Sequence, residues 1–274
     1  MQSITCITQN LAGAKMTHEP RPTPPPPSGD CDTDCPYCKG TGYFRYDVPL
    51  GHPQFGKINR CPTAYAKNLK NSLQQGTIDP RFGLTADEAG NLSWELVIEG
   101  INQADRARNV TRKAYESGHG LVFLHGGYGQ GKSLLLKIVA ATALRAGKRA
   151  AYANLATVLD DIRAAYDERE NKMTELIRRM EWWTSLDVLA IDELDKVGKT
   201  DWAQERIFQL LDARYQCAVR QQSLTIIASN HSSLDELSGY LRSRIEDNRF
   251  VSHGYVIHLA GEDGRRIMPD DYHY

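Results

Sequence analysis

Residues 126–133 of this chain read Gly126-Gly127-Tyr128-Gly129-Gln130-Gly131-Lys132-Ser133, which fits the pattern G-x-x-x-x-G-K-[ST] at every position. The apolar run at residues 121–125 is typical of a buried strand, and apolar side chains recur at helical spacing over residues 133–147. A strand, a glycine-rich loop and a helix form the context of a phosphate-binding loop, because the loop N–H groups converge on an anion at the positive end of the helix. An ordinary glycine-rich turn is the alternative, and the flanking elements make it the weaker interpretation. The sequence therefore predicts a nucleoside triphosphate site.

Two residues at the end of this loop have separate predicted tasks. Lys132 can reach the β- and γ-phosphates, and the Ser133 hydroxyl can bind Mg²⁺. The other six residues of the loop are candidates for contact with the nucleotide through their backbone.

A second apolar run, at residues 186–191, ends in the acidic pair Asp192 and Glu193. The end of a strand in an open α/β sheet is where ligand-handling groups lie. Asp192 is predicted to hold Mg²⁺, directly or through water, and Glu193 to polarise the water that attacks the γ-phosphate. The alternative is that both carboxylates cap the start of the next helix. Because a phosphate-binding loop precedes it in the sequence, the acidic pair indicates hydrolysis of the nucleotide. The glutamate favours an ATPase over a GTPase.

A third predicted strand, residues 224–229, ends at Asn230. Its amide is a candidate for orienting the lytic water, although asparagine at a strand end is also an ordinary turn residue. A predicted helix at residues 240–247 follows and carries Arg242 and Arg244. Arginines on a helix surface usually pair with acidic neighbours. The alternative hypothesis is that one of these arginines reaches the γ-phosphate of a nucleotide bound to a neighbouring subunit.

Taken in order, these motifs resemble those of the AAA+ ATPases of the DnaC/DnaI helicase-loader and DnaA initiator group. The segment from Asp192-Glu193-Leu194-Asp195-Lys196-Val197 through residues 203–215 is especially similar to DnaC-type loaders, including those of phages and prophages. The resemblance spans roughly residues 35 to 266. It implies an α/β fold of the P-loop NTPase (AAA+) type, with a three-layer αβα core around a parallel sheet. It also implies ATP and Mg²⁺ as ligands.

The resemblance assigns roles to individual residues. Asn230 would be sensor 1, and Arg244, in the Ser-Arg-Ile position, would be the arginine finger that acts on a neighbour in a homo-oligomer, with Arg242 as the second choice. The stretch Gly261-Glu262-Asp263-Gly264-Arg265 is similar to the G-x-D-x-R tail of these proteins, which makes Arg265 the candidate sensor 2. Arg266 lies beside it, and the assignment between the two stays open.

Four of the six cysteines fall in one N-terminal stretch, at Cys31, Cys35, Cys38 and Cys61. Residues 1–20 lack the continuous apolar core of a secretory signal, so a cytoplasmic location and reduced cysteines are expected. A Cys-x-x-Cys knuckle with further cysteines then predicts a tetrahedral Zn²⁺ site, with free thiols or a redox pair as the alternative. Cys35, Cys38 and Cys61 are the expected ligands.

The fourth zinc ligand is open between Cys31 and His52. The stretch resembles phage-type loader sequences in which a knuckle, an Asp-Val-Pro-x-Gly-His-Pro-x-Phe-Gly segment and a second cysteine pair follow one another. Here the second pair is reduced to Cys61, followed by Pro62-Thr63-Ala64. Cys31 can supply the missing sulfur and is favoured over His52.

The composition allows one sizeable core and a small additional module. The chain has 274 residues, 41% of them hydrophobic, a net charge of −1, and no apolar run of membrane-spanning length. This charge gives no indication of nucleic-acid binding by itself. The expected domains are a disordered Pro-rich tail (1–30), a zinc-binding helicase-interaction module (31–75), a linker with a helix leading into the core (76–118), and the AAA+ ATPase domain (119–274).

Helices are expected at residues 64–75 and 94–116, and as a long insertion at residues 155–183. In initiators and loaders this insertion contacts single-stranded DNA. Here residues 160–182 mix seven acids with five bases, which is closer to a solvated helix pair than to a basic stripe. Trp182 and Trp183 can stack on bases but fit core packing better.

Two functions from different classes follow. The first is an ATP-switched loader that places a replicative helicase on single-stranded DNA. The second is a transposition helper ATPase of the IstB type, which partners a transposase. The N-terminal zinc module favours the loader. A passive ATP-sensing module is disfavoured because it would not need Glu193, Asn230 or Arg244.

Overall fold

The structure is a computed structural model, and it describes residues 31–50, 55–97, 103–167, 171–196, 200–261 and 263. Its main sheet has five parallel strands in the order β4-β5-β6-β3-β7. Every residue of β3, β5 and β6 is buried, as expected for a parallel sheet covered on both faces. The strands are β3 (Gly120–Gly126), β4 (Ala150–Asn154), β5 (Val188–Asp192), β6 (Leu224–Ser229) and β7 (Val256–Leu259).

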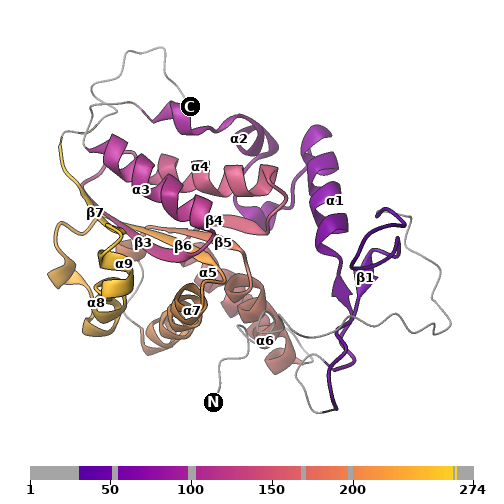
Figure 1. Cartoon of the computed structure of the whole chain (residues 1–274). Coiled ribbons are helices and arrows are strands. Elements are labelled where there is room, and N and C mark those ends of the chain that lie inside the picture. Colours follow the sequence, from indigo (N-terminus) through magenta and orange to yellow (C-terminus); the bar gives the residue numbers. More distant parts are fainter. Residues whose placement is uncertain are drawn as a thin grey trace.

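Helices cover both faces of this sheet (Figure 1). On one face lie α3 (Ala104–Ser117) and α4 (Lys132–Arg145). On the other lie α5 (Leu155–Arg163), α6 (Lys172–Thr184) and α7 (Asp201–Val219). Two short helices, α8 (Gly239–Ile245) and α9 (Asn248–Val251), contact β3 at one side. The predicted three-layer α/β fold with a parallel sheet is confirmed.

The strand order brings three predicted site segments together. β6 lies between β3 and β5, with Leu224 paired to both Gly120 and Val188. Because the strands are parallel, the carboxyl ends of β3, β5 and β6 lie at the same edge of the sheet. The glycine-rich loop, the acidic pair and Asn230 follow those three ends directly.

The segment before the core packs on the sheet and on α4. It contains α2 (Ala86–Asn91) and the short 3-10 helices η2 (Pro80–Phe82) and η3 (Trp94–Leu96). Lys137 of α4 pairs with Glu88 of α2 at 2.6 Å. Gly83, in the left-handed region with φ 70°, lies so close to β4 that a Cβ there would be 1.7 Å from the Tyr152 carbonyl oxygen. The η2 segment therefore lies against β4, whereas α2 lies against α4.

The helix expected over residues 94–116 is shorter at its start. Trp94–Leu96 form only a 3-10 turn, Val97 is extended, and α3 begins at Ala104 after Gln103, whose φ is 60°. A left-handed residue cannot continue an α-helix, so the prediction of one continuous helix was wrong.

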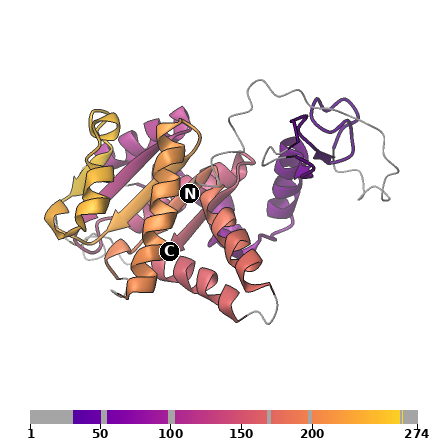
Figure 2. The ribbon, with the colours of Figure 1, turned by 90° about the horizontal axis from the view of Figure 1, so that it is seen from below.

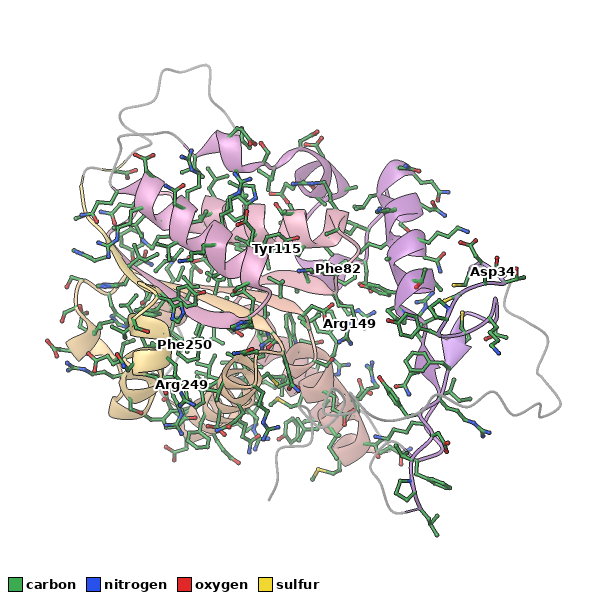
Figure 3. All side chains as sticks on the ribbon, viewed as in Figure 1. Asp34, Phe82, Tyr115, Arg149, Arg249 and Phe250 are labelled. Atoms are coloured by element: carbon green, nitrogen blue, oxygen red, sulfur yellow. The ribbon has the colours of Figure 1, made fainter. Side chains whose placement is uncertain are left out.

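The insertion between β4 and β5 is held together by ion pairs. Glu175 accepts hydrogen bonds from Arg178 and Arg179, each at 2.6 Å, and Arg179 also reaches Asp161 at 2.9 Å. Its tryptophans pack inward: Trp183 is buried, and Trp182 stacks on Phe82 with ring centroids 6.5 Å apart. Phe82 is labelled in Figure 3. Among the described residues of α5 and α6, three acids and three bases are thus paired with one another.

Arg214 of α7 is completely buried. Its guanidinium donates to the Thr225 hydroxyl at 2.8 Å, to the Leu224 carbonyl at 2.6 Å, and to the carbonyls of Thr184 and Leu186. Desolvation lowers the pKa of Arg214 to about 9, and these hydrogen bonds satisfy the buried cation. Arg214 thereby joins α7 and the end of α6 to the starts of β5 and β6.

The N-terminal module lies beside this core (Figure 2). Its strands β1 (Tyr43–Phe44) and β2 (Asn59–Arg60) pair antiparallel, and α1 (Pro62–Gln74) begins directly after Cys61. α1 contacts α4 and α2, and Ala66 approaches Gly147 so closely that a Cβ at Gly147 would lie 2.4 Å from its side chain. Among the described residues, none of the helices combines the length and apolar character needed to cross a membrane.

Candidate nucleotide site and cysteine cluster

The glycine-rich loop joins β3 to α4 and packs against β7. Gly126, Gly129 and Gly131 have φ values of 140°, 70° and 80°, which favour glycine. A Cβ on Gly126 would lie 2.0 Å from the Leu259 carbonyl oxygen. The loop therefore needs glycine both for its turn and for its contact with β7.

The chain after β7 continues across the same loop. The Gln130 side chain donates a hydrogen bond to the Gly261 carbonyl at 3.2 Å. A Cβ on Gly129 would lie 1.7 Å from a carboxylate oxygen of Asp263, so this carboxylate lies against the loop backbone. Arg265, the sensor 2 candidate, and Arg266 lie outside the described residues.

Lys132 is the first residue of α4, and its side chain is buried inside the loop. Its ammonium donates to the carbonyls of Gly126 at 2.8 Å and Gly127 at 2.6 Å. Desolvation lowers the pKa of Lys132, and the carboxylates of Asp192 and Asp195 oppose that shift. Ser133 follows as the second residue of α4. The loop thus holds a poorly hydrated cation at a helix N-terminus, which suits phosphate binding.

Asp192 ends β5 and is buried. One carboxylate oxygen accepts the Tyr152 hydroxyl proton at 2.9 Å, and the other accepts the Glu193 backbone N–H at 2.8 Å. Burial and the carboxylate of Asp192 both raise the pKa of Tyr152. The role of Tyr152 could not be predicted from the sequence, because its contact with Asp192 depends on β4 lying beside β5.

Glu193 occupies the left-handed region, with φ 54°. Non-glycine residues rarely adopt this conformation, and they concentrate at functional sites. The 3-10 turn η5 (Leu194–Lys196) follows, and the Lys196 ammonium forms an ion pair with the Glu193 carboxylate. The same ammonium lies 5.9 Å from the ring centre of Tyr128 in the glycine-rich loop. Lys196 therefore contacts both the Glu193 carboxylate and the Tyr128 ring of the glycine-rich loop.

Asn230 follows β6 and is held by Asp195 of η5. The Asp195 carboxylate accepts the Asn230 backbone N–H at 2.8 Å and its side-chain amide at 3.1 and 3.3 Å. Burial alone would raise the pKa of Asp195, but the hydrogen bonds from Asn230 outweigh it and hold that pKa below its usual value. Asp195 and Lys196 were not singled out from sequence, although both lie within one turn of the acidic pair.

Arg244 lies on α8 between two tyrosine rings. Its guanidinium carbon is 4.7 Å from the ring centres of both Tyr215 and Tyr240, and the guanidinium pairs with Asp212 at 3.4 Å. Arg242 pairs instead with Asp235 and, at 2.9 Å, with Glu246. Within the described part of the chain, the contacts of Arg244 are thus with α7 and α8, and the structure does not bring it together with the other predicted site residues.

The four N-terminal cysteines form one buried cluster. All four sulfurs lie within 4.8 Å of one another, and Cys61 is 3.6 Å from Cys35 and 3.9 Å from Cys31. Sulfurs bound 2.3 Å from one tetrahedral Zn²⁺ would lie about 3.8 Å apart, so the cluster fits this ion. The structure thus brings Cys31 together with the other three, whereas His52 lies outside the described residues.

Backbone N–H groups support the cluster. Burial raises the pKa of the Cys35 thiol, but hydrogen bonds from the N–H groups of Cys38 and Tyr37 outweigh it and lower that pKa to about 6. Cys61 sits at the N-terminus of α1, where the N–H groups of Ala64 and Thr63 oppose the rise that burial causes in its pKa. The position of Cys35 thus favours the thiolate, the form that binds metal, whereas burial and the neighbouring thiols raise the pKa of Cys31 and leave that of Cys61 above its usual value.

Residues 122–253 match the family described as "ATPase family associated with various cellular activities (AAA)". These residues form an AAA ATPase domain. The match covers the glycine-rich loop, the acidic pair and Asn230, and an AAA ATPase domain supports ATPase activity in this protein. A comparison with the sequences of curated proteins finds no match.

Solved structures similar to this chain include two of the initiator DnaA. DnaA from Aquifex aeolicus bound to AMPPCP has a TM-score of 0.51 and 20% identity, covering 64% of this chain and 52% of that one. Domain III of Thermotoga maritima DnaA has a TM-score of 0.52 and 19% identity, covering 66% and 70%. A DnaC helicase loader has a TM-score of 0.47 and 22% identity, covering 63% and 98%. The chain matches about half the length of the longer DnaA structure, and the DnaA likeness shows a shared fold.

Proposed function

We propose that this protein is a cytoplasmic, ATP-switched loader that places a replicative DNA helicase on single-stranded DNA. The observation that carries the proposal is a second module, built around a cysteine cluster, attached through α1 to the AAA ATPase domain. This module exposes large apolar side chains, among them Tyr43 (41% exposed), Phe55 (51%) and Ile58 (77%). Exposed apolar side chains that gather on a small module are typical of a protein-binding surface. We assign this surface to the helicase.

In the ATPase domain we assign one task to each group at the edge of the sheet. The loop from Gly126 to Gly131 cradles the phosphates, and Lys132 leaves its carbonyl partners to neutralise their charge. Ser133 and Asp192 would hold Mg²⁺, which when bound neutralises the phosphate charge that develops during hydrolysis. Glu193 takes a proton from the attacking water, and Asn230 orients that water.

In the N-terminal module we assign Cys31, Cys35, Cys38 and Cys61 as the ligands of one structural Zn²⁺. The sulfur separations of 3.6 and 3.9 Å support this set. Four cysteine sulfurs in tetrahedral arrangement are a usual ligand set of structural zinc.

We further propose that the protein works as a homo-oligomer in which Arg244 completes the site of a neighbouring subunit. The contacts of Arg244 with Asp212, Tyr215 and Tyr240 orient its guanidinium within its own chain. A trans arginine stabilises the γ-phosphate as it leaves and raises the rate about 10³–10⁵-fold in GTPase-activating systems. We expect a smaller factor in a loader, because loaders hydrolyse ATP slowly.

The Arg244→Ala variant is therefore expected to keep the ATP affinity of the parent and to lose the rise of ATPase activity per subunit with protein concentration. Mixing it with Lys132→Ala should restore activity, since one variant supplies an intact loop and the other an intact finger. Phosphate release across a concentration series measures both effects. If Arg244→Ala hydrolyses ATP like the parent at every concentration, the assignment fails. A loss confined to Arg242→Ala would transfer the role to Arg242.

A pull-down of the full chain with ATP from its native cell tests the loader assignment. Recovery of a replicative helicase that depends on Lys132 and is lost in a Tyr43→Ala, Ile58→Ala variant supports the loader. Recovery of a transposase in its place would favour the helper ATPase of the IstB type.

A further inference from the structure

We propose that Asp195 is a positioning residue, which fixes the Asn230 amide so that its carbonyl oxygen is presented to the attacking water. A carboxylate can only accept hydrogen bonds, so the end of the Asn230 amide that faces Asp195 is its NH₂ group. That group lies 3.1 and 3.3 Å from the two carboxylate oxygens. The carbonyl end of the same amide is therefore turned away from Asp195.

Asp195 also fixes the backbone that carries this amide. One of its oxygens accepts the Asn230 backbone N–H at 2.8 Å and the Ser229 hydroxyl at 3.3 Å. Asp195 lies on η5, directly after the acidic pair of β5, whereas Ser229 and Asn230 lie at the end of β6. The carboxylate thus joins the ends of two adjacent strands and sets the position of Asn230 relative to Glu193.

This orientation has a chemical consequence, which rests on the role proposed for Glu193. A water molecule has two O–H groups, and here it meets two acceptors, the Glu193 carboxylate and the Asn230 carbonyl oxygen. As the water oxygen bonds to the γ-phosphorus, the bond from phosphorus to the ADP oxygen breaks and one proton passes to Glu193. The second O–H stays hydrogen-bonded to Asn230, which leaves an oxygen lone pair aimed at phosphorus. Asn230 therefore acts as a hydrogen-bond acceptor for water and does not donate to the phosphate.

Four variants of the full chain test this inference by their kcat, KM for ATP and melting temperature. They are Asn230→Ala, Asp195→Asn, the combination Asp195→Asn/Asn230→Ala, and the exchange Asp195→Asn/Asn230→Asp. Asp195→Asn should lower kcat about tenfold and change KM less than twofold, because an asparagine at residue 195 no longer dictates which way the Asn230 amide turns. The combination should be no slower than Asn230→Ala alone, because Asp195 acts only through Asn230.

The exchanged variant tests whether residue 230 accepts a hydrogen bond from the attacking water or donates one to the phosphate. In it, the new asparagine donates to the new aspartate, whose other oxygen still accepts from water, so kcat should exceed that of Asp195→Asn. An exchanged protein that is slower than Asp195→Asn would overturn the inference, as would a tenfold loss in the combination beyond Asn230→Ala. Asp87→Asn is the matched control: Asp87 of α2 also accepts a hydrogen bond from an asparagine amide, that of Asn91 at 2.6 Å, but at the exposed surface, and its replacement should keep kcat within twofold.

The same variants distinguish a wrong role for Asn230 from a wrong role for Asp195. If Asn230→Ala hydrolyses ATP like the parent, the role of Asn230 in the proposed function is wrong. If Asn230→Ala is slow but Asp195→Asn is as fast as the parent, only the positioning role of Asp195 is wrong.

Discussion

Replacing Glu193 by glutamine is expected to leave ATP binding intact and to slow hydrolysis about 10²–10⁴-fold, the contribution usual for a general base. Glutamine keeps the size of the side chain but cannot take a proton from water. The loop and Lys132, which bind the phosphates, are untouched by the change. Phosphate release and calorimetric titration with MgATP measure the two effects separately.

Glu116→Gln is the matched control for this prediction. Glu116 is an exposed residue of α3 whose carboxylate pairs with Arg112 at 3.1 Å. Its replacement removes the same charge far along the sequence from the site and should leave turnover unchanged. Hydrolysis at the parent rate in Glu193→Gln would place the base on another residue.

Removal of zinc is expected to unfold the N-terminal module and to spare the ATPase domain. The buried cluster of this module, among the described residues, consists of the four cysteines and Ala64. So small an apolar set cannot hold a fold, and zinc binding supplies about 10–16 kcal/mol in comparable peptides. Metal analysis should find one Zn²⁺ per chain, and limited proteolysis after chelation should cut within residues 31–61 with ATP binding retained.

The cysteine variants identify the ligands. Cys38→Ser should lose zinc, and Cys31→Ser should lower its occupancy whereas His52→Ala should not. Lys67→Ala, which removes an exposed ion pair with Asp32 at 3.4 Å, controls for a general effect on the module. If neither Cys31→Ser nor His52→Ala lowers zinc occupancy, the proposed ligand set is wrong.

The parts of the fold that the sequence predicts well are those with a strong local pattern. The predicted strand at residues 224–229 coincides with β6, and the glycine-rich loop lies between β3 and α4 as expected. Both signals are short-range, since apolar runs and glycines at fixed offsets describe one strand, one turn and one helix start.

The contacts that complete the site depend on which strands are neighbours, and a single sequence does not contain that information. Tyr152 reaches Asp192 across 40 residues, and Asn230 reaches Asp195 across 35. Arg214 shows the same limit, because an arginine on a helix is expected at the surface, whereas here four acceptors from other elements hold it in the core. The left-handed backbone of Glu193 could not be predicted either, because glutamate has no preference for this conformation.

The most direct test of the nucleotide site is calorimetric titration of MgATP into the parent protein and into Lys132→Ala. The parent should bind one ATP per chain. Lys132→Ala should lose at least about 100-fold in affinity, because a cation buried in the loop no longer meets the phosphates. Lys113→Ala, which removes an exposed lysine of α3, should bind like the parent. A Lys132→Ala protein with the ATP affinity of the parent would contradict the assignment of this loop as the phosphate-binding site.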